Sequence, residues 1–223
     1  MCKFKSFVVT DKLEVFWLKY EDSHEKIIRE YKLDDTRNSI CRVEISPTGS
    51  LSSTNTDDWE IKVDEEAIPE WYTENKAFLE DKMLQVVVNE VVPLLVDYEG
   101  SLDLEGTQIK DLGNLQSVGG WLDLSGTQIK DLGNLQSVGE NLYLSGTQIK
   151  DLGNLQSIGA SLDLSGTQIK DLGNLQSVGE NLWLQGTQVK DLGNLQRVGG
   201  GLWLQGTQVK DLGNVNVGRG IYR

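Results

Sequence analysis

The C-terminal half of the chain repeats one pattern of apolar and polar positions with a period of 20 residues. The shared text is x-L-x-L-x-G-T-Q-[IV]-K-D-L-G-N-L-Q-x-V-G-x, and the copies depart from it at few positions. A fixed period of this length is typical of a solenoid, because one such coil cannot bury its apolar residues alone and must stack on its neighbours. The six copies begin at Ser101, Trp121, Asn141, Ser161, Asn181 and Gly201.

Two kinds of apolar spacing follow one another within each copy. In the second copy, Leu122 and Leu124 alternate with polar or aromatic residues, which is the pattern of a strand with one buried face. The rest of the copy has an apolar residue at every third position, namely Ile129, Leu132, Leu135 and Val138. We therefore expect one strand per coil, a parallel sheet with strands about 4.8 Å apart, and an outward strand face that stays open.

The invariant polar positions are interpreted as parts of the architecture. The Asn column, Asn114 to Asn214, and the Thr column, Thr107 to Thr207, suit hydrogen bonds to backbone groups at turns. The Lys column, Lys110 to Lys210, runs beside the Asp column, Asp111 to Asp211. We expect these two lines of opposite charge to neutralise each other.

The repeat text resembles two known repeat families. Leu-x-Leu-x-Gly-Thr-Gln-Ile followed by Leu-x-x-Leu resembles leucine-rich repeats, with Thr127 at the position of their usual Asn ladder. Asn-Leu-Gln-Ser-Val-Gly-Gly-Trp-Leu-Asp-Leu-Ser-Gly resembles the coil of receptor L domains. The resemblance covers 101–217 and implies a right-handed parallel β-solenoid of six leucine-rich-like coils, but no particular function.

The first 98 residues have no repeat, and their mixed pattern predicts a small acidic α+β domain. Strands are predicted within 3–19, 39–46 and 59–63, with a loop over 47–58. Helices are predicted from Asp22 or Ser23 to about Lys32 and over 74–92, where the apolar stripe is Leu79, Met83, Val86, Val87 and Val91. We expect the second helix to cap the solenoid, which occupies 99–223 and ends in a degenerate C-terminal cap.

A second resemblance concerns this N-terminal domain. Asp22-Ser23-His24-Glu25, the pair Ile27-Ile28 and the later Arg42-Val43-Glu44-Ile45 resemble an uncharacterised domain of small phage and bacterial proteins. The resemblance implies no activity, but it favours an origin in a phage or another mobile element.

The charge of the chain restricts its partners. The formal net charge is −13, and residues 1–100 hold 22 acidic and 12 basic side chains. An acidic chain without a basic stripe argues against direct binding of nucleic acid or of an anionic membrane surface. Two cysteines, no signal peptide and no apolar run long enough to span a membrane favour a cytoplasmic protein of a bacterium or a phage-infected host.

The sequence shows no set of residues that predicts a reaction. His24 is the only histidine, and with Cys2 and Cys41 it lacks the paired spacing of a zinc site. No phosphate-binding or dinucleotide-binding glycine motif is present. We therefore expect no catalytic residues, no metal and no cofactor, and hence a protein that is not an enzyme.

The copies differ from one another mainly on the outward strand face. Four aromatic residues occur there, and rings outside a core are typical anchors of protein interfaces. Trp183 and Trp203 are neighbours in one column, flanked by Gln185 and Gln205. The alternative is that the rings pack internally or join two copies of the chain. The predicted partner-binding residues are Trp121, Tyr143, Trp183, Trp203, Gln185, Gln205, Asn141, Asn181, Asp123 and Asp163.

The leading hypothesis is a non-enzymatic module that binds a protein partner through this aromatic strand face. One alternative is a phage-encoded anti-defence inhibitor whose acidic N-terminal domain mimics nucleic acid, through the acidic residues of 57–66 and 70–81. A further alternative is a carbohydrate-binding module, since rings beside amides suit sugar faces. An ice-binding surface ranks below these, because its Thr array would be one column wide.

Overall fold

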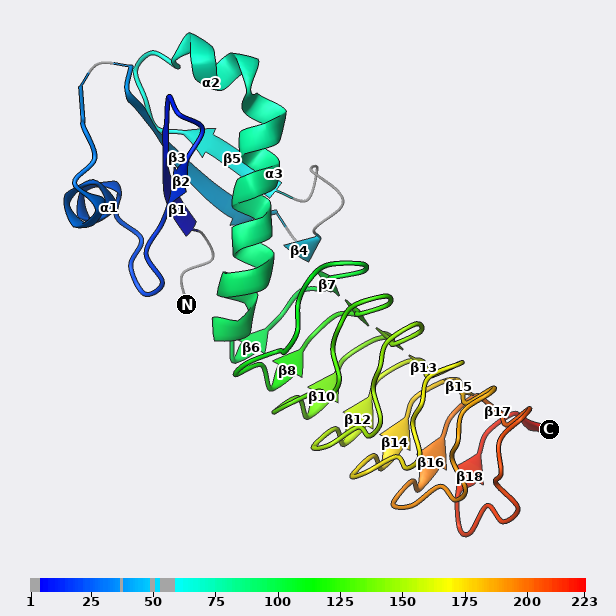
Figure 1. Ribbon diagram of the computed structural model, residues 1–223. Coiled ribbons are helices and arrows are strands. Elements are labelled where there is room, and N and C mark those ends of the chain that lie inside the picture. The colour runs from blue at the N-terminus through cyan, green and yellow to red at the C-terminus, as the bar shows by residue number, and fades with distance from the viewer. Residues whose placement is uncertain (1–4, 37, 49–50, 53–58) are drawn as a thin grey trace. The chain divides into compact units, whose positions relative to one another are not determined.

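The computed structural model of the protein describes residues 5–36, 38–48, 51–52 and 59–223 (Figure 1). The chain folds as two compact units, Met1–Val91 and Val92–Arg223. The first is α+β and the second is a parallel β-solenoid of about six coils, so the predicted fold class is confirmed at this level. Cys2 and most of the loop predicted over 47–58 lie outside the described residues.

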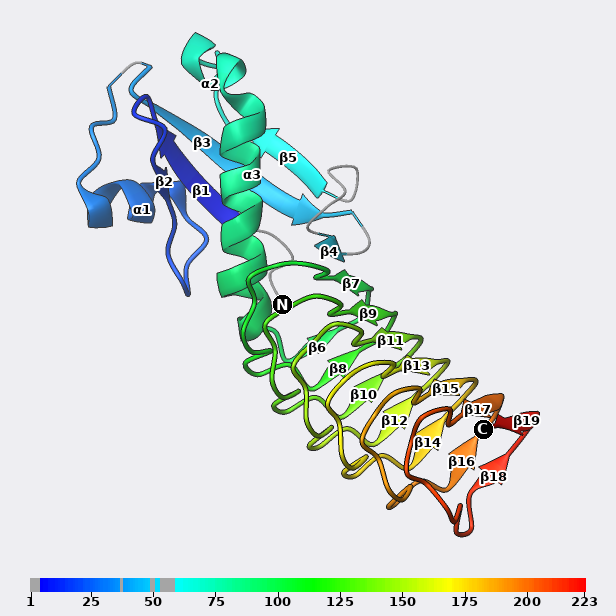
Figure 2. The same cartoon turned by 45° about the vertical axis from the view of Figure 1, so that its right-hand side comes forward.

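The first unit is built on an antiparallel sheet with the strand order β2-β1-β3-β5. Helix α1 (His24–Tyr31) covers one face, where its Ile27 packs with Val8 and Ile40. Helix α3 (Lys76–Val86) lies across the sheet in both views (Figure 1 and Figure 2). Every residue of β1 is buried as a result. The strands are β1 (Lys5–Thr10), β2 (Val15–Phe16), β3 (Ile40–Pro47) and β5 (Trp59–Val63), and β4 (Leu51–Ser52) is a further short strand.

The helix predicted over 74–92 is present but changes its geometry along its length. A short helix α2 (Glu70–Glu74) precedes α3, and α3 continues as a π-helix, η2 (Val87–Val91), and a 3-10 turn, η3 (Val92–Leu94). The wider π turn rotates the following residues around the axis. The predicted stripe is wrong in part, because Val86, which precedes the π turn, and Val91, which is its last residue, are only half-buried. The buried residues are Leu79, Met83, Leu84, Val87, Val88 and Val92.

Each coil of the solenoid contributes two strands, where sequence analysis predicted one. One parallel sheet contains β7 (Leu102–Asp103), β9 (Leu122–Asp123), β11 (Leu142–Tyr143), β13 (Leu162–Asp163), β15 (Leu182–Trp183), β17 (Gly201–Trp203) and β19 (Gly220–Tyr222). The other contains β6 (Asp97–Tyr98), β8 (Ser117–Val118), β10 (Ser137–Val138), β12 (Ser157–Ile158), β14 (Ser177–Val178), β16 (Arg197–Val198) and β18 (Asn216–Val217). Val138 has no apolar residue two positions before or after it, unlike Leu122 and Leu124, so the second strand left no alternating pattern in the sequence.

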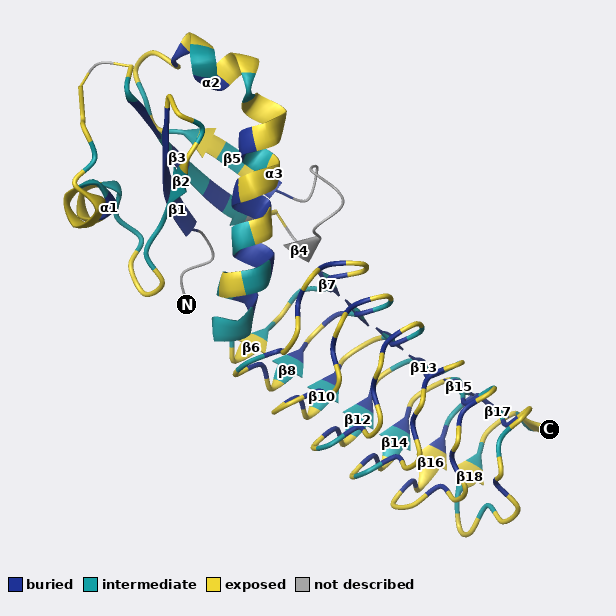
Figure 3. Cartoon of the chain, in the orientation of Figure 1, coloured by how far each residue is buried: buried dark blue, intermediate teal, exposed yellow. Residues whose placement is uncertain are grey.

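The six apolar columns fill the inside of the coils, as the spacing predicts. From Leu102 to Val198 every member of these columns is at most 4% exposed. The buried positions line the inside of every coil in Figure 3. Strand residues pair with those 20 positions further on, as Leu142 does with Leu162, so each column keeps its alignment from coil to coil. Burial of this apolar surface is the main favourable term that holds the stack together.

Three of the four polar columns bond to the backbone. The Thr127 hydroxyl donates to Leu124 O at 2.7 Å, and Asn134 Nδ2 donates to Gly113 O of the preceding coil at 3.2 Å, which confirms the expected roles of the Thr and Asn columns. Asp131 Oδ1 accepts the Gly133 N–H at 3.0 Å. Among the described residues no ion pair joins the Asp and Lys columns, so these carboxylates bond to the turn, and mutual neutralisation of the two columns stays a prediction.

The residues predicted to form a degenerate C-terminal cap continue both sheets. Leu202 pairs with Ile221 and Trp203 with Tyr222, so the last coil is one residue shorter than the others. At the other end, a half-coil from Val92 precedes the first full copy, and Asn114 N donates to Pro93 O at 3.0 Å. Whether 74–92 caps the stack stays a prediction.

The coils touch most closely at the glycine of the Val-Gly corner. A Cβ built on Gly159 would lie 1.9 Å from Gly139 O of the preceding coil, whereas one built on Gly166 has no atom within 4 Å. We predict that Gly159→Ala lowers the free energy of unfolding by more than 2 kcal/mol, about the upper range for overpacking. Gly166→Ala, at a φ of +70°, should cost about 1 kcal/mol. Urea unfolding of both variants measures this, and equal losses would contradict the corner contact.

Candidate functional site

The predicted partner-binding residues lie on the outward face of the sheet that contains β7 to β19. Strand geometry alternates side chains between the two faces, so Trp183 in β15 and Trp203 in β17 point away from the buried Leu182 and Leu202. Nine of the ten predicted residues are half-buried, and Gln205 is exposed.

Three rings stack on one another at the C-terminal end of this face. The Trp183 and Trp203 ring centroids are 5.4 Å apart with 28° between the ring planes. The Trp203 and Tyr222 centroids are 4.7 Å apart with 15° between the planes. Neighbouring strands of a sheet are spaced by about the same distance, so strand pairing itself holds the rings in a stack. We call Trp183, Trp203 and Tyr222 the aromatic ladder.

Tyr222 is the member that sequence analysis missed. Its strand text Gly-Ile-Tyr repeats the Gly-Leu-Trp of 201–203, and the structure pairs the two segments residue by residue. The offset between the two segments is 19 rather than 20 positions, so a search with a period of 20 placed 220–222 in the predicted degenerate C-terminal cap. Tyr222 is 45% exposed and is the most accessible ring of the ladder.

The residue at the start of β17 makes room for the ladder. A Cβ built on Gly201 would lie 2.5 Å from Trp203 Cη2 and 3.1 Å from Tyr222 Cε2. The Trp203 ring therefore lies over the backbone of Gly201, where any other residue would displace it. The other copies have Ser, Asn or Trp at this position.

The second outward column shows what the aromatic residues replace. Asp123 Oδ1 accepts the Ser125 N–H at 2.8 Å, and Asp163 Oδ1 accepts the Ser165 N–H at 2.9 Å. Each bond forms an Asx turn at the end of its strand. Tyr143, Trp183 and Trp203 occupy the same column and have no carboxylate to offer. At these three positions the turn therefore lacks the hydrogen bond that an aspartate side chain provides.

The two predicted partner-binding asparagines already make hydrogen bonds within the solenoid. Asn141 Oδ1 accepts the Ser161 N–H at 3.0 Å, and Asn181 Oδ1 accepts the Gly201 N–H at 3.0 Å. Only their amide nitrogens remain for a partner. Gln185 accepts from the Ser165 hydroxyl at 3.2 Å. Of the predicted polar groups, Gln205 is therefore the most available to a partner.

The structure does not bring all four predicted aromatics together. Trp121 and Tyr143 lie on other coils, and among the described residues neither makes a ring contact with the ladder. Trp203 has a ring stacked on each of its two faces, so it offers no free face to a sugar. Carbohydrate binding stays a prediction.

The first unit contains the other candidates named by sequence analysis. Cys41 is fully buried, and burial raises the pKa of its thiol to about 12, with a smaller contribution from the Glu65 carboxylate. Cys2 lies outside the described residues, so the structure does not unite Cys2, Cys41 and His24. In the acidic stretches, Glu65 pairs with Arg42 at 2.8 Å, and Asp57 and Asp58 lie outside the described residues. Nucleic-acid mimicry stays a prediction.

Comparison with protein-family models, with curated proteins and with solved structures finds no match to this chain. The resemblances to leucine-rich repeats, receptor L domains and the phage domain therefore stay predictions. None of the helices in the described part of the chain has the length and apolar character needed to cross a bilayer.

We predict that Gly201→Ala breaks the aromatic ladder without unfolding the solenoid. The added methyl group would occupy the place of the Trp203 ring, which must then rotate away from Trp183. Circular dichroism should show loss of the exciton coupling between the two indoles, with Trp203→Ala as the reference for complete loss. A wild-type spectrum in Gly201→Ala would contradict the geometry.

We also predict that the Cys41 thiol is inert in the native protein. Only the thiolate reacts, and its formation is suppressed at neutral pH by the raised pKa and by burial. In a Cys2→Ser background, a thiol reagent at pH 8 should label Cys41 only as fast as the first unit opens. Stoichiometric labelling within minutes under native conditions would contradict this.

Proposed function

We propose that the protein is a non-enzymatic interaction module whose solenoid binds a protein partner through the aromatic ladder. The observation that carries the proposal is the stack of Trp183, Trp203 and Tyr222 on an outward strand face. Tryptophan and tyrosine are the side chains most enriched among residues that dominate binding energy.

The rings are ordered before any partner arrives. Each ring is held by its strand and by the neighbouring ring, so binding immobilises few rotamers. Ordering a free side chain at an interface costs about 0.5–1.5 kcal/mol, and the ladder avoids most of this cost. Preorganisation of this kind supports a binding role over a chance cluster of apolar side chains.

The other sheet offers no comparable anchors on its outward face. A groove along it is lined mainly by small residues, in particular the Ser column from Ser117 to Ser177 and the Gly column from Gly119 to Gly179. Small side chains offer a partner little apolar surface to bury on binding. The contrast favours the ladder face as the interface, with Gln205 and Gln185 as polar groups at its rim.

The test compares capture of partners by the wild type and by Trp183→Ala/Trp203→Ala from bacterial lysate, followed by affinity measurement on the purified partner. Each ring should contribute at least about 2 kcal/mol, so the double variant should bind more than 100-fold more weakly. Tyr20→Ala, at a ring of the first unit that is 82% exposed, is the matched control and should change the affinity less than tenfold.

Size-exclusion chromatography with mass measurement separates a foreign partner from a second copy of the chain. A wild-type dimer that Trp183→Ala/Trp203→Ala converts to a monomer would make the ladder a self-association surface and would contradict the proposal. Equal capture of the same partner by both proteins would place the interface elsewhere.

A further inference from the structure

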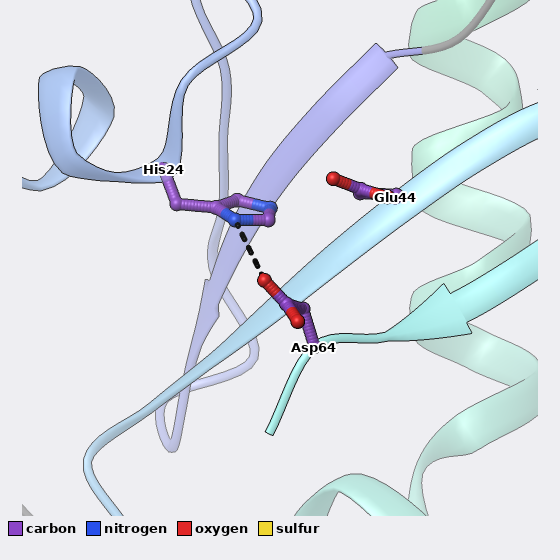
Figure 4. A group of neighbouring side chains, drawn as sticks. All are labelled: His24, Glu44 and Asp64. Carbon is purple, nitrogen blue, oxygen red and sulfur yellow. Dashed lines mark ion pairs between the residues drawn. The ribbon is translucent and has the colours of Figure 1, made fainter. Parts of the chain in front are cut away.

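Three side chains that sequence analysis did not connect meet on the sheet of the first unit. His24 is the first residue of α1, Glu44 lies in β3, and Asp64 directly follows β5. One imidazole nitrogen and one carboxylate oxygen from each acid all lie within 4.8 Å of one another. Figure 4 shows both carboxyl groups beside the imidazole ring.

The backbone around these side chains is fixed by ordinary secondary structure. Glu44 pairs with Lys62 across the β3–β5 ladder, and Asp64 N donates to Arg42 O at 2.9 Å, which extends the ladder beyond β5. The Ser23 side chain caps α1 by accepting the Lys26 N–H, so the position of His24 is also set. The three groups are therefore brought together by the fold rather than by a loose loop.

The hydrogen bond of His24 determines which nitrogen is free. Its Nε2 lies 3.3 Å from Val43 O, and a carbonyl can only accept, so Nε2 carries the proton. If the ring is neutral, Nδ1 carries a lone pair, and this atom lies 3.7 Å from Asp64 Oδ2. The His24 side chain is nine-tenths buried. A lone pair on Nδ1 and the Asp64 carboxylate would repel each other, and a cation bound between them would remove this repulsion.

The nearby basic side chains do not fill this role. Arg42 pairs with Asp35 at 2.6 Å and with Glu65 at 2.8 Å. Lys62, the cross-strand neighbour of Glu44, is exposed and makes no ion pair with Glu44 or Asp64 among the described residues. The carboxylates of Glu44 and Asp64 remain available to an added cation.

We propose that His24, Glu44 and Asp64 bind a divalent transition-metal ion, with Zn²⁺ bound more tightly than Mn²⁺. One imidazole and two carboxylates suit ions of this class, and the stability order of divalent metals places Zn²⁺ above Mn²⁺. Ca²⁺ would need six to eight oxygen ligands, which this group does not supply.

The geometry needs only a small adjustment to hold the ion. Bonds of about 2.1 Å to a tetrahedral Zn²⁺ require ligand atoms about 3.4 Å apart. The Asp64 side chain is 54% exposed and free to turn towards Nδ1. The hydrogen bond from Nε2 to Val43 O orients the imidazole, as outer hydrogen bonds commonly do for metal-binding histidines. Three protein ligands leave at least one coordination position for water or for a group from a partner.

The experiment is calorimetric titration of the full chain with Zn²⁺ and with Mn²⁺ in 0.15 M salt, in a Cys2→Ser background that removes the N-terminal thiol. We expect one saturable Zn²⁺ per chain and weaker Mn²⁺ binding. Asp64→Asn and Glu44→Gln should each lower the Zn²⁺ affinity at least tenfold, while Glu60→Gln, an exposed carboxylate of β5, should leave it unchanged.

A second measurement uses Co²⁺, whose visible absorption reports its ligands directly. Bands of a nitrogen- and oxygen-ligated ion should appear in the wild type and be lost in Asp64→Asn, whose circular dichroism should match the wild type. The proposal is overturned if Zn²⁺ fails to bind saturably or if Asp64→Asn and Glu44→Gln bind it as the wild type does. The first outcome would mean that a proton on Nδ1 is the only cation shared with Asp64.

Discussion

The solenoid depends on one constraint, which is that every coil must pair its backbone with the next coil at a fixed offset along the chain. Leu142 pairs with Leu122 and with Leu162, and the second sheet repeats the same offset between Ser137 and Ser157. Any group that widens the gap at one corner breaks hydrogen bonds in both sheets. The glycine corners and the Asn side chains that donate to the preceding coil meet this constraint, which explains why the repeat text varies so little.

The same constraint creates the candidate site. Side chains of one outward column repeat at the strand spacing, which is close to the stacking distance of aromatic rings. Two tryptophans in one column therefore stack where Gly201 leaves room for the Trp203 ring, and Tyr222 extends the stack by one coil. Aspartate suits the fold better at this position, because Asp123 and Asp163 each accept a backbone N–H of the following turn. This contrast supports the proposal that the rings serve a partner and not the coil.

The sequence predicts structure best where the same buried position recurs in every 20-residue copy. Six coils repeat the buried columns, so the interior of the solenoid and its outward face could be predicted from spacing alone. Other features left no such signal: the strand Ser137–Val138 has a single apolar residue, and Tyr222 lies 19 rather than 20 positions after Trp203. In the helix after α2, a π turn over Val87–Val91 leaves Val91 half-buried, and ordinary helical spacing does not predict such a turn.

The meeting of His24, Glu44 and Asp64 was beyond sequence reasoning for a different reason. It depends on which strands pair and in which register, and no local pattern in a four-stranded sheet specifies this. The partner-binding roles of Asn141 and Asn181 were predicted from their place in a variable outward column, while their oxygens accept backbone N–H groups of the next coil. Polar residues on a solenoid must therefore be compared with the backbone groups one coil away before they are assigned to a partner.

The central claim is that the aromatic ladder is a surface carried by the stack and is not part of what holds the stack together. Amide hydrogen exchange in Trp183→Ala/Trp203→Ala tests this directly, because Leu184 N donates to Trp203 O and Leu204 N donates to Tyr222 O. We predict that both amides keep their protection within about tenfold of the wild type, which corresponds to a change of at most about 1.4 kcal/mol in the free energy of local opening. Protection that collapses across 181–222 would show that the rings stabilise the last coils and would contradict the account.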